Sequence, residues 1–127
     1  MKVADTSYIV EGLLRKKELI EEQDQILTSY LAIFEVTNAL WKHEHLLKDI
    51  DDGLDYLTIF YGLVDSRKIL PLDASEELLR SSSLLARRNE ISTYDAIFVA
   101  LAVSTGLELL TFDQRQSEVM RRETRRS

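Results

Sequence analysis

Short apolar runs and longer amphipathic stretches alternate along this chain. The short runs predict four strands, at Lys2–Ala4, Ile26–Thr28, Lys68–Leu72 and Leu107–Phe112. Apolar residues at helical spacing predict helices at Tyr8–Leu14, Ser29–Leu47, Leu54–Asp65, Ala74–Arg88 and from Gln114 to about Arg122. A further helix, with Ser92 or Thr93 as its cap, carries Asp95 and ends at Gly106. Alternation of this kind predicts an α/β fold in which a parallel sheet carries helices on both faces.

The apolar stripes also predict how deeply some helices are buried. The stripe of the helix at Ser29–Leu47 comprises Leu31, Ile33, Phe34, Val36, Leu40, Trp41 and Leu47. A stripe this wide predicts a largely buried helix. In the helix at Ala74–Arg88, we expect Leu78, Leu79, Leu84 and Leu85 to point inward. For the first helix, Thr6 or Ser7 is the expected N-cap.

Length and composition limit the number of domains and the classes of protein to which this chain can belong. The 127 residues predict one domain, residues 1–127, in which the Arg-rich end at 121–127 is a candidate for fraying. No apolar run approaches the roughly 18 residues that span a bilayer, and Asp5 interrupts any N-terminal signal region. Since the chain has no cysteine, it has neither disulfides nor thiolate metal ligands, and we expect a cytoplasmic protein. The net charge of −6 argues against broad binding to phosphate backbones, unless cations screen a local acidic cluster.

Four carboxylates stand in or beside otherwise apolar sequence: Asp5, Glu35, Asp95 and Asp113. Asp5 and Asp113 follow predicted strands, Glu35 lies in the helix after the second strand, and Asp95 begins the helix before the last strand. Ligands of parallel sheets bind beyond the carboxyl ends of the strands, so we expect these acids to face one pocket.

Such an acidic pocket requires a counter-charge. Two carboxylates about 4 Å apart repel each other by roughly 4 kcal/mol at an effective dielectric constant of 20, and a divalent cation would relieve this repulsion. Oxygen ligands without His or Cys favour Mg²⁺ or Mn²⁺. A cation held by acids can position a phosphate and activate water, which makes phosphodiester hydrolysis the expected chemistry.

Each acid also has a structural explanation. Asp5 and Asp113 could cap the helices that follow them, and Asp95 could be an acid favoured in the first turn of a helix. Glu35 is the hardest to explain in this way, because it lies in the middle of a mostly apolar helix. His43 and His45 are two residues apart, so they cannot share a metal on one helix face, and we interpret both as surface residues.

Four segments carry the four acids: ADTSYIV, AIFEVTNAL, STYDAIFVALA and LLTFD. Together they resemble the PIN-domain ribonucleases, most of all the VapC-type toxins of toxin–antitoxin pairs. The resemblance implies a three-layer α/β/α fold with a central parallel sheet of four or five strands. It also implies an endoribonuclease dependent on Mg²⁺ or Mn²⁺, with Asp5, Glu35, Asp95 and Asp113 as catalytic and metal-binding residues. Ser7, Asn38 and Thr111 match the polar positions that flank these acids.

The same resemblance implies partners. It predicts a homodimer, an RNA substrate and a VapB-type antitoxin, whose C-terminal segment would block a groove formed by the helices at Ser29–Leu47 and Leu54–Asp65. The chain departs from many relatives because its end, VMRRETRRS, has no apolar run for a fifth strand.

Other functions remain open from the sequence. One is a PIN-like binding or assembly module with little catalysis, and another is a PIN nuclease of RNA processing. A phospho-accepting receiver domain fits poorly, because it needs a second acid at the end of the first strand and a lysine after the last strand.

Overall fold

The computed structural model describes residues 1–126 and has the predicted α/β architecture. Its strands are β1 (Lys2–Ala4), β2 (Ile26–Ser29), β3 (Ile69–Leu72) and β4 (Leu109–Leu110). Its helices are α1 (Thr6–Leu14), α2 (Glu18–Glu21), α3 (Leu31–Lys42), the π-helical turn η1 (His43–Leu47), α4 (Gly53–Asp65), α5 (Glu76–Asn89), α6 (Thr93–Thr105) and α7 (Gln114–Arg126). Within residues 1–126, no helix combines the length and apolar character needed to cross a membrane.

The sheet has four parallel strands in the order β3-β2-β1-β4. Val3 of β1 pairs with Leu27 of β2 on one side and with Leu109 of β4 on the other. Because all strands run the same way, their carboxyl ends meet at one edge, as the alternation of strands and helices predicted.

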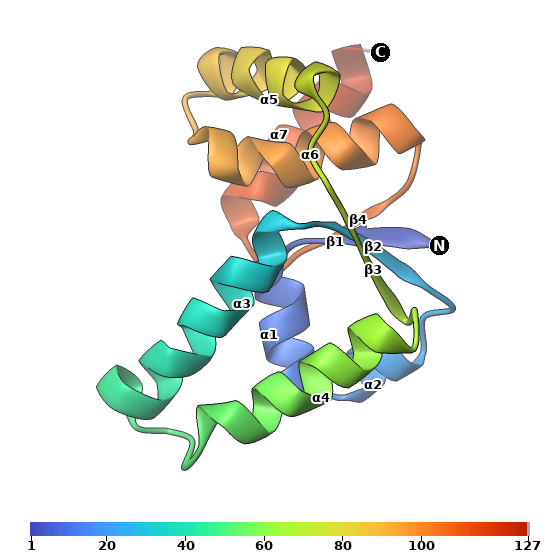
Figure 1. The fold of residues 1–127 in the computed structure, drawn as a ribbon. Helices are drawn as coiled ribbons and strands as arrows, with labels where there is room; N and C mark the ends of the chain where they lie inside the picture. The colour runs from blue at the N-terminus through green and yellow to red at the C-terminus, as the bar shows by residue number, and fades with distance from the viewer. Residues whose placement is uncertain (127) are drawn as a thin grey trace.

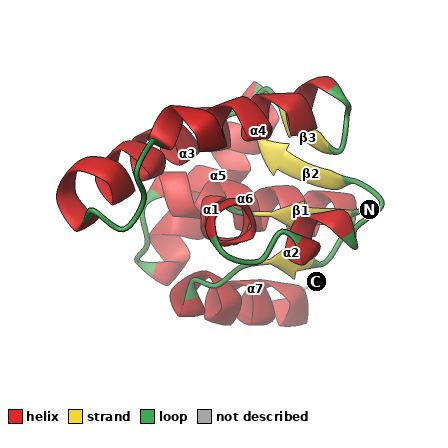
Figure 2. Cartoon of the chain, turned by 90° about the horizontal axis from the view of Figure 1, so that it is seen from below, coloured by secondary structure: helices red, strands yellow, loops and turns green. Residues whose placement is uncertain are grey.

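Helices cover both faces of this sheet (Figures 1 and 2). Helices α5, α6 and α7 lie on one face, whereas α1, α2, α3 and α4 lie on the other. Alternate strand residues serve the two faces, so Val3 packs with Leu101 of α6, and Ala4 packs with Ile9 of α1. Residues 96–102 of α6 are all buried, which explains why this helix is apolar on all sides.

The helix caps differ in part from expectation. Asp5, rather than Thr6 or Ser7, is the N-cap of α1, because its Oδ1 accepts a hydrogen bond from the Tyr8 N–H at 3.1 Å. This confirms the alternative explanation of Asp5 as a cap. Ser92 caps α6 in the same way, and Gly106 ends α6 at φ 70°, a conformation that glycine adopts without strain.

Several apolar side chains that we expected inside are exposed. In α3 and η1 these are Phe34, Trp41 and Leu47, and in α5 they are Leu79 and Leu84. Only the narrower set Ala32, Val36 and Leu40 of α3 is fully buried. Helical spacing predicts which residues share a face, but it does not show how much of that face the neighbouring helices cover.

The C-terminal part also differs from expectation. Strand β4 ends at Leu110, after which the Phe112 N–H bonds to Ser7 Oγ at 2.9 Å and the Phe112 ring stacks on Tyr8. Helix α7 continues to Arg126 instead of ending near Arg122 or fraying, because the buried Glu123 ties its last turns to Arg88.

Candidate active site

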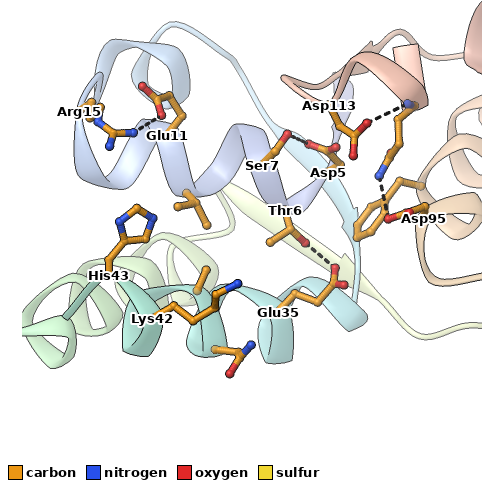
Figure 3. Close-up of a pocket in the computed structure, with 15 residues that line it drawn as sticks. Asp5, Thr6, Ser7, Glu11, Arg15, Glu35, Lys42, His43, Asp95 and Asp113 are labelled. Atoms are coloured by element: carbon orange, nitrogen blue, oxygen red, sulfur yellow. Dashed lines mark hydrogen bonds and ion pairs between the residues drawn. The ribbon is translucent and has the colours of Figure 1, made fainter. Parts of the chain in front are cut away.

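A cavity of about 460 Å³ opens at the carboxyl edge of the sheet, between α1, α3 and the first turns of α6 and α7. The four acids singled out from the sequence, Asp5, Glu35, Asp95 and Asp113, all line it (Figure 3). Four distant parts of the chain therefore bring their carboxylates to one place, as the parallel topology predicted.

Asp5 is the most deeply buried of these acids, with 1% of its surface exposed. The Ser7 hydroxyl donates to its Oδ1 at 2.7 Å, and the Thr111 hydroxyl donates to its Oδ2 at 2.5 Å. Burial raises the pKa of Asp5, the hydrogen bonds from Thr111, Ser7 and the Tyr8 N–H oppose that rise, and the charge of Asp113 adds to it. The net result is a pKa above the ordinary value of 3.8.

Glu35 approaches the cavity from α3. Its Oε1 accepts a hydrogen bond from the Thr6 hydroxyl at 2.7 Å. Burial raises the pKa of Glu35, the Thr6 bond lowers it, and the charges of Asp95 and Asp5 raise it further, so the pKa lies above 4.5. The acids are thus close enough to oppose one another's ionisation.

Gln116 of α7 connects the other two acids, and sequence reasoning missed it. Its backbone N–H donates to Asp113 Oδ1 at 3.1 Å, so Asp113 caps α7, and its Nε2 lies 3.5 Å from Asp95 Oδ1. Its Oε1 is buried without a hydrogen-bond partner in the part of the chain that the structure describes. A glutamine in a polar helix gives little indication of a role in a site. The signal that the sequence offered was its position three residues after Asp113, an acid that can cap a helix.

The three polar residues that flank the acids are not equivalent. Ser7 and Thr111 both bond to Asp5, and Thr111 Oγ1 also accepts from the Asp113 N–H at 2.9 Å. Asn38 lines the cavity, but its exposed side chain has no hydrogen-bond partner among residues 1–126. Thr6, which we expected only as a cap, instead holds Glu35.

The far end of the cavity carries basic side chains (Figure 3). Arg15, Lys42 and His43 line it there. Arg15 pairs with Glu11 at 2.8 Å, and His43 Nδ1 lies 2.8 Å from Asp49 Oδ1, whereas Lys42 has no ion pair within residues 1–126. His43 is therefore part of the cavity wall rather than a plain surface residue.

The groove that leads to the acids runs between α1 and α3. The resemblance had implied a groove between the helices at Ser29–Leu47 and Leu54–Asp65. That helix pair instead forms a different, mostly apolar pocket of about 370 Å³, lined in part by Leu40, Trp41 and Leu54.

The donor set at the acid end suits a hard divalent cation, because it consists of carboxylate, hydroxyl and amide oxygens. As the side chains stand, no three acidic or histidine side chains within residues 1–126 form a group close enough to hold a metal. Asp5 and Glu35 are turned toward hydroxyl groups instead. In the chemistry of their oxygen donors, the residues fit Mg²⁺ or Mn²⁺.

The chain is therefore a parallel α/β/α sandwich whose candidate site consists of acids that converge at the carboxyl edge of the sheet. The chain belongs to the PIN-domain family, whose model matches residues 2–121. It is 34% identical over 114 residues to the ribonuclease VapC3 of Pyrobaculum aerophilum, a match that covers 87% of this chain and 84% of that protein.

A solved structure shows the same fold. The chain superimposes on the crystal structure of PAE2754 from Pyrobaculum aerophilum with a TM-score of 0.74, over 93% of this chain and 83% of the other. The two sequences are 24% identical, so this likeness concerns the fold alone.

Proposed function

We propose that this protein is an endoribonuclease that depends on Mg²⁺ or Mn²⁺ and acts as the toxin of a type II toxin–antitoxin pair. The observation that carries the proposal is the convergence of Asp5, Glu35, Asp95 and Asp113 in one cavity. The raised pKa values of Asp5 and Glu35 indicate a site that favours added positive charge. The similarity to a protein named ribonuclease VapC3 supports RNA as the substrate.

The chain's own residues would divide the work. Asp5, Glu35, Asp95 and Asp113 would hold the cation, which when bound polarises the phosphate and lowers the pKa of the attacking water. Ser7 and Thr111 orient Asp5 through their hydroxyl groups. A carboxylate of the acid set would accept the proton that the water loses.

The shape of the cavity supports a nucleic-acid strand along it. The scissile phosphodiester would lie at the acid end, and a neighbouring phosphate would reach the basic side chains of Lys42 and Arg15 at the far end. This arrangement lets an acidic protein bind RNA locally, without a basic surface overall.

Cleavage of single-stranded RNA tests the proposal. We expect cleavage in Mn²⁺ or Mg²⁺, none in EDTA, and a loss of at least about 100-fold in Asp5→Asn and in Asp95→Asn, by analogy with the loss of a preorganised charged group at an active site. Asp65→Asn is the matched control, because Asp65 is an exposed acid at the end of α4, outside the cavity. Full cleavage by both active-site variants would rule the assignment out.

The partners follow from the same proposal. We expect a VapB-type antitoxin to cover the α1–α3 groove and inhibit cleavage, and we expect a homodimer. Because the proposed RNA substrate and antitoxin are both cytoplasmic, we expect the protein to act there.

An upstream gene that encodes a small DNA-binding protein, together with inhibition of cleavage by its C-terminal segment, would support the toxin role over RNA processing. Light scattering would measure the oligomeric state.

A further inference from the structure

A second pocket adjoins the acid cavity on the side of α3 and α6. It has a volume of about 300 Å³ and is lined by Leu31, Phe34, Glu35, Asn38 and Tyr94. Four of these residues lie at i, i+3, i+4 and i+7 on α3, so they form one stripe of that helix. Glu35 and Asn38 line both the pocket and the acid cavity, so the two spaces meet along this stripe.

Two exposed aromatic rings flank this pocket. Phe34 is 66% exposed and Tyr94, the residue before Asp95, is 64% exposed. The Tyr30 ring supports Phe34 from outside the pocket, with ring centroids 6.2 Å apart, whereas Phe34 and Tyr94 make no ring contact with each other within residues 1–126. Both rings therefore keep a free surface beside the acids, in a place where large exposed apolar groups mark binding.

The pocket also offers unused hydrogen-bonding groups. Neither the Asn38 amide nor the Tyr94 hydroxyl has a partner among residues 1–126. A carboxamide presents both a donor and an acceptor, the combination that reads the edge of a base. Aromatic faces with a free amide are the features by which proteins hold unpaired RNA bases.

We propose that this pocket, formed by Leu31, Phe34, Asn38 and Tyr94, holds one unpaired nucleobase next to the phosphodiester on which the acids act. The inference rests on the proposed function, because in RNA a base lies one sugar away from its phosphate. A strand with its scissile phosphate at the acids therefore places an adjacent base on the Phe34–Asn38 stripe. Stacking would supply affinity and hold the base in place, and the Asn38 amide would supply preference among the bases held there.

Cleavage of a randomised single-stranded RNA pool in Mn²⁺, with the product ends sequenced, provides the first test. We expect the wild type to prefer one base at a single position beside the cut. Phe34→Leu and Tyr94→Leu keep apolar bulk but remove the ring. They should weaken that preference and raise KM by roughly 5- to 150-fold, the equivalent of one lost stacking interaction, with kcat nearly unchanged. Tyr94→Phe should retain the stacking, and Asn38→Ala should retain affinity but lose discrimination.

Binding provides a second test that needs no cleavage. Single-stranded RNA carrying 2-aminopurine, whose fluorescence is quenched by stacking, is titrated in Mn²⁺ into the Asp5→Asn variant, with and without Phe34→Leu. Quenching that disappears with Phe34→Leu supports the base pocket. Tyr61→Leu, which removes an exposed aromatic ring from α4 away from both pockets, is the matched control and should leave quenching unchanged.

The outcomes separate the two proposals. No metal-dependent cleavage by the wild type would refute the nuclease, while the fluorescence still decides the base pocket. Cleavage with an unaltered base preference and KM in Phe34→Leu and Tyr94→Leu would overturn the base pocket alone. If the same variants instead convert a dimer to a monomer without changing quenching, the two rings form a contact between subunits and the inference is wrong.

Discussion

The hydroxyl groups of Ser7 and Thr111 replace the water that Asp5 has lost. With 1% of its surface exposed, Asp5 would hardly ionise unless donors reached both carboxylate oxygens. Ser7 serves Oδ1 and Thr111 serves Oδ2, and each hydroxyl also accepts from a backbone N–H in residues 112–113. Two small side chains thus fix the orientation of Asp5 and tie the end of β1 to the segment after β4.

The first residue-scale prediction concerns Thr111→Val. This change preserves shape but removes the donor to Asp5 Oδ2 and the acceptor of the Asp113 N–H. We expect the free energy of unfolding to fall by about 1–3 kcal/mol. The pKa of Asp5 should rise further, because a hydrogen bond to the charged form is lost.

The measurements are denaturant unfolding and the pH profile of RNA cleavage. In Thr111→Val the acid limb of that profile should move to higher pH, because Asp5 with a raised pKa ionises only at a higher pH. Thr111→Ser keeps the hydroxyl and should match the wild type in both measurements. A Thr111→Val profile that coincides with that of the wild type would mean that this hydroxyl does not control Asp5.

Residues differed in how readily the sequence revealed them. Asp95 and Glu35 were predictable because each is the only charge in a long apolar stretch, where burial would be costly without a purpose. Gln116 and Thr6 were not, because a glutamine or threonine beside other polar residues is ordinary at a helix start. Only the packing of α7 on α6, and of α1 on α3, turns these two side chains toward the acids.

At the scale of elements, one buried carboxylate holds α7 against α5. Glu123 of α7 accepts hydrogen bonds from Arg88 at 2.5 Å and from the Asn89 amide at 2.9 Å, and Arg126 lies 3.8 Å away. The hydrogen bond from Arg88 is the main cause of a pKa of Glu123 below its ordinary 4.5. The charged form of Glu123 therefore stabilises the folded state.

Glu123→Gln should weaken this contact. We expect a loss of about 1–3 kcal/mol at pH 7, because the change removes the charge from a hydrogen-bonded pair whose carboxylate is buried and whose Arg88 partner is partly exposed. Since the folded pKa is lowered, the stabilisation is complete above about pH 4.5 and fades as the pH falls through the folded value. The difference between wild type and variant should therefore shrink in acid.

Glu118→Gln provides the comparison, because Glu118 is an exposed acid on the same helix, without an ion pair within residues 1–126. Urea unfolding followed by circular dichroism at pH 7 and pH 3.5 measures both variants. Equal stability of Glu123→Gln and Glu118→Gln at pH 7 would show that the buried pair does not hold α7.

The type and order of the helices and strands could be predicted, but not which residues on their outer faces are exposed. Helical spacing placed Phe34 with Val36 on one broad stripe, yet only Val36 is buried, because periodicity does not reveal where the neighbouring helix ends. The Arg-rich end was expected to fray, but Glu123 finds Arg88, some 35 residues away in sequence. Pairings of this kind depend on tertiary packing, which no local pattern encodes.

For the whole molecule, the parallel topology determines where charge accumulates. Strands β1 and β4 deliver Asp5 and Asp113 to one edge of the sheet, and α3 and α6 bring Glu35 and Asp95 to it. The sequence predicted this convergence because alternating strands and helices allow few other arrangements. It did not predict that Asp5 and Glu35 would face hydroxyl groups, since such details depend on side-chain rotamers.

The crowded acids have a consequence for stability. Both Asp5 and Glu35 have folded pKa values above their ordinary values of 3.8 and 4.5. Between these values and the raised ones, the folded state holds more protons than the unfolded state, so these two groups make the free energy of unfolding decrease as the pH rises. Without a cation, the site therefore destabilises the fold at neutral pH.

A divalent cation should reverse that effect. Because Mn²⁺ binds the ionised acids of the folded state, it should stabilise the protein by about 2.7 kcal/mol at 100 times its Kd. The rise in Tm between EDTA and excess Mn²⁺ should shrink as the pH falls below the raised pKa values of Asp5 and Glu35, and grow as the pH rises through the window in which they ionise. Differential scanning calorimetry at several pH values measures this rise in Tm.

Asp5→Asn should lose most of the rise in Tm, whereas Asp65→Asn should keep it. An identical Tm in EDTA and Mn²⁺ at pH 7 would mean that these acids tolerate one another without a metal, and the proposed cofactor would have no site.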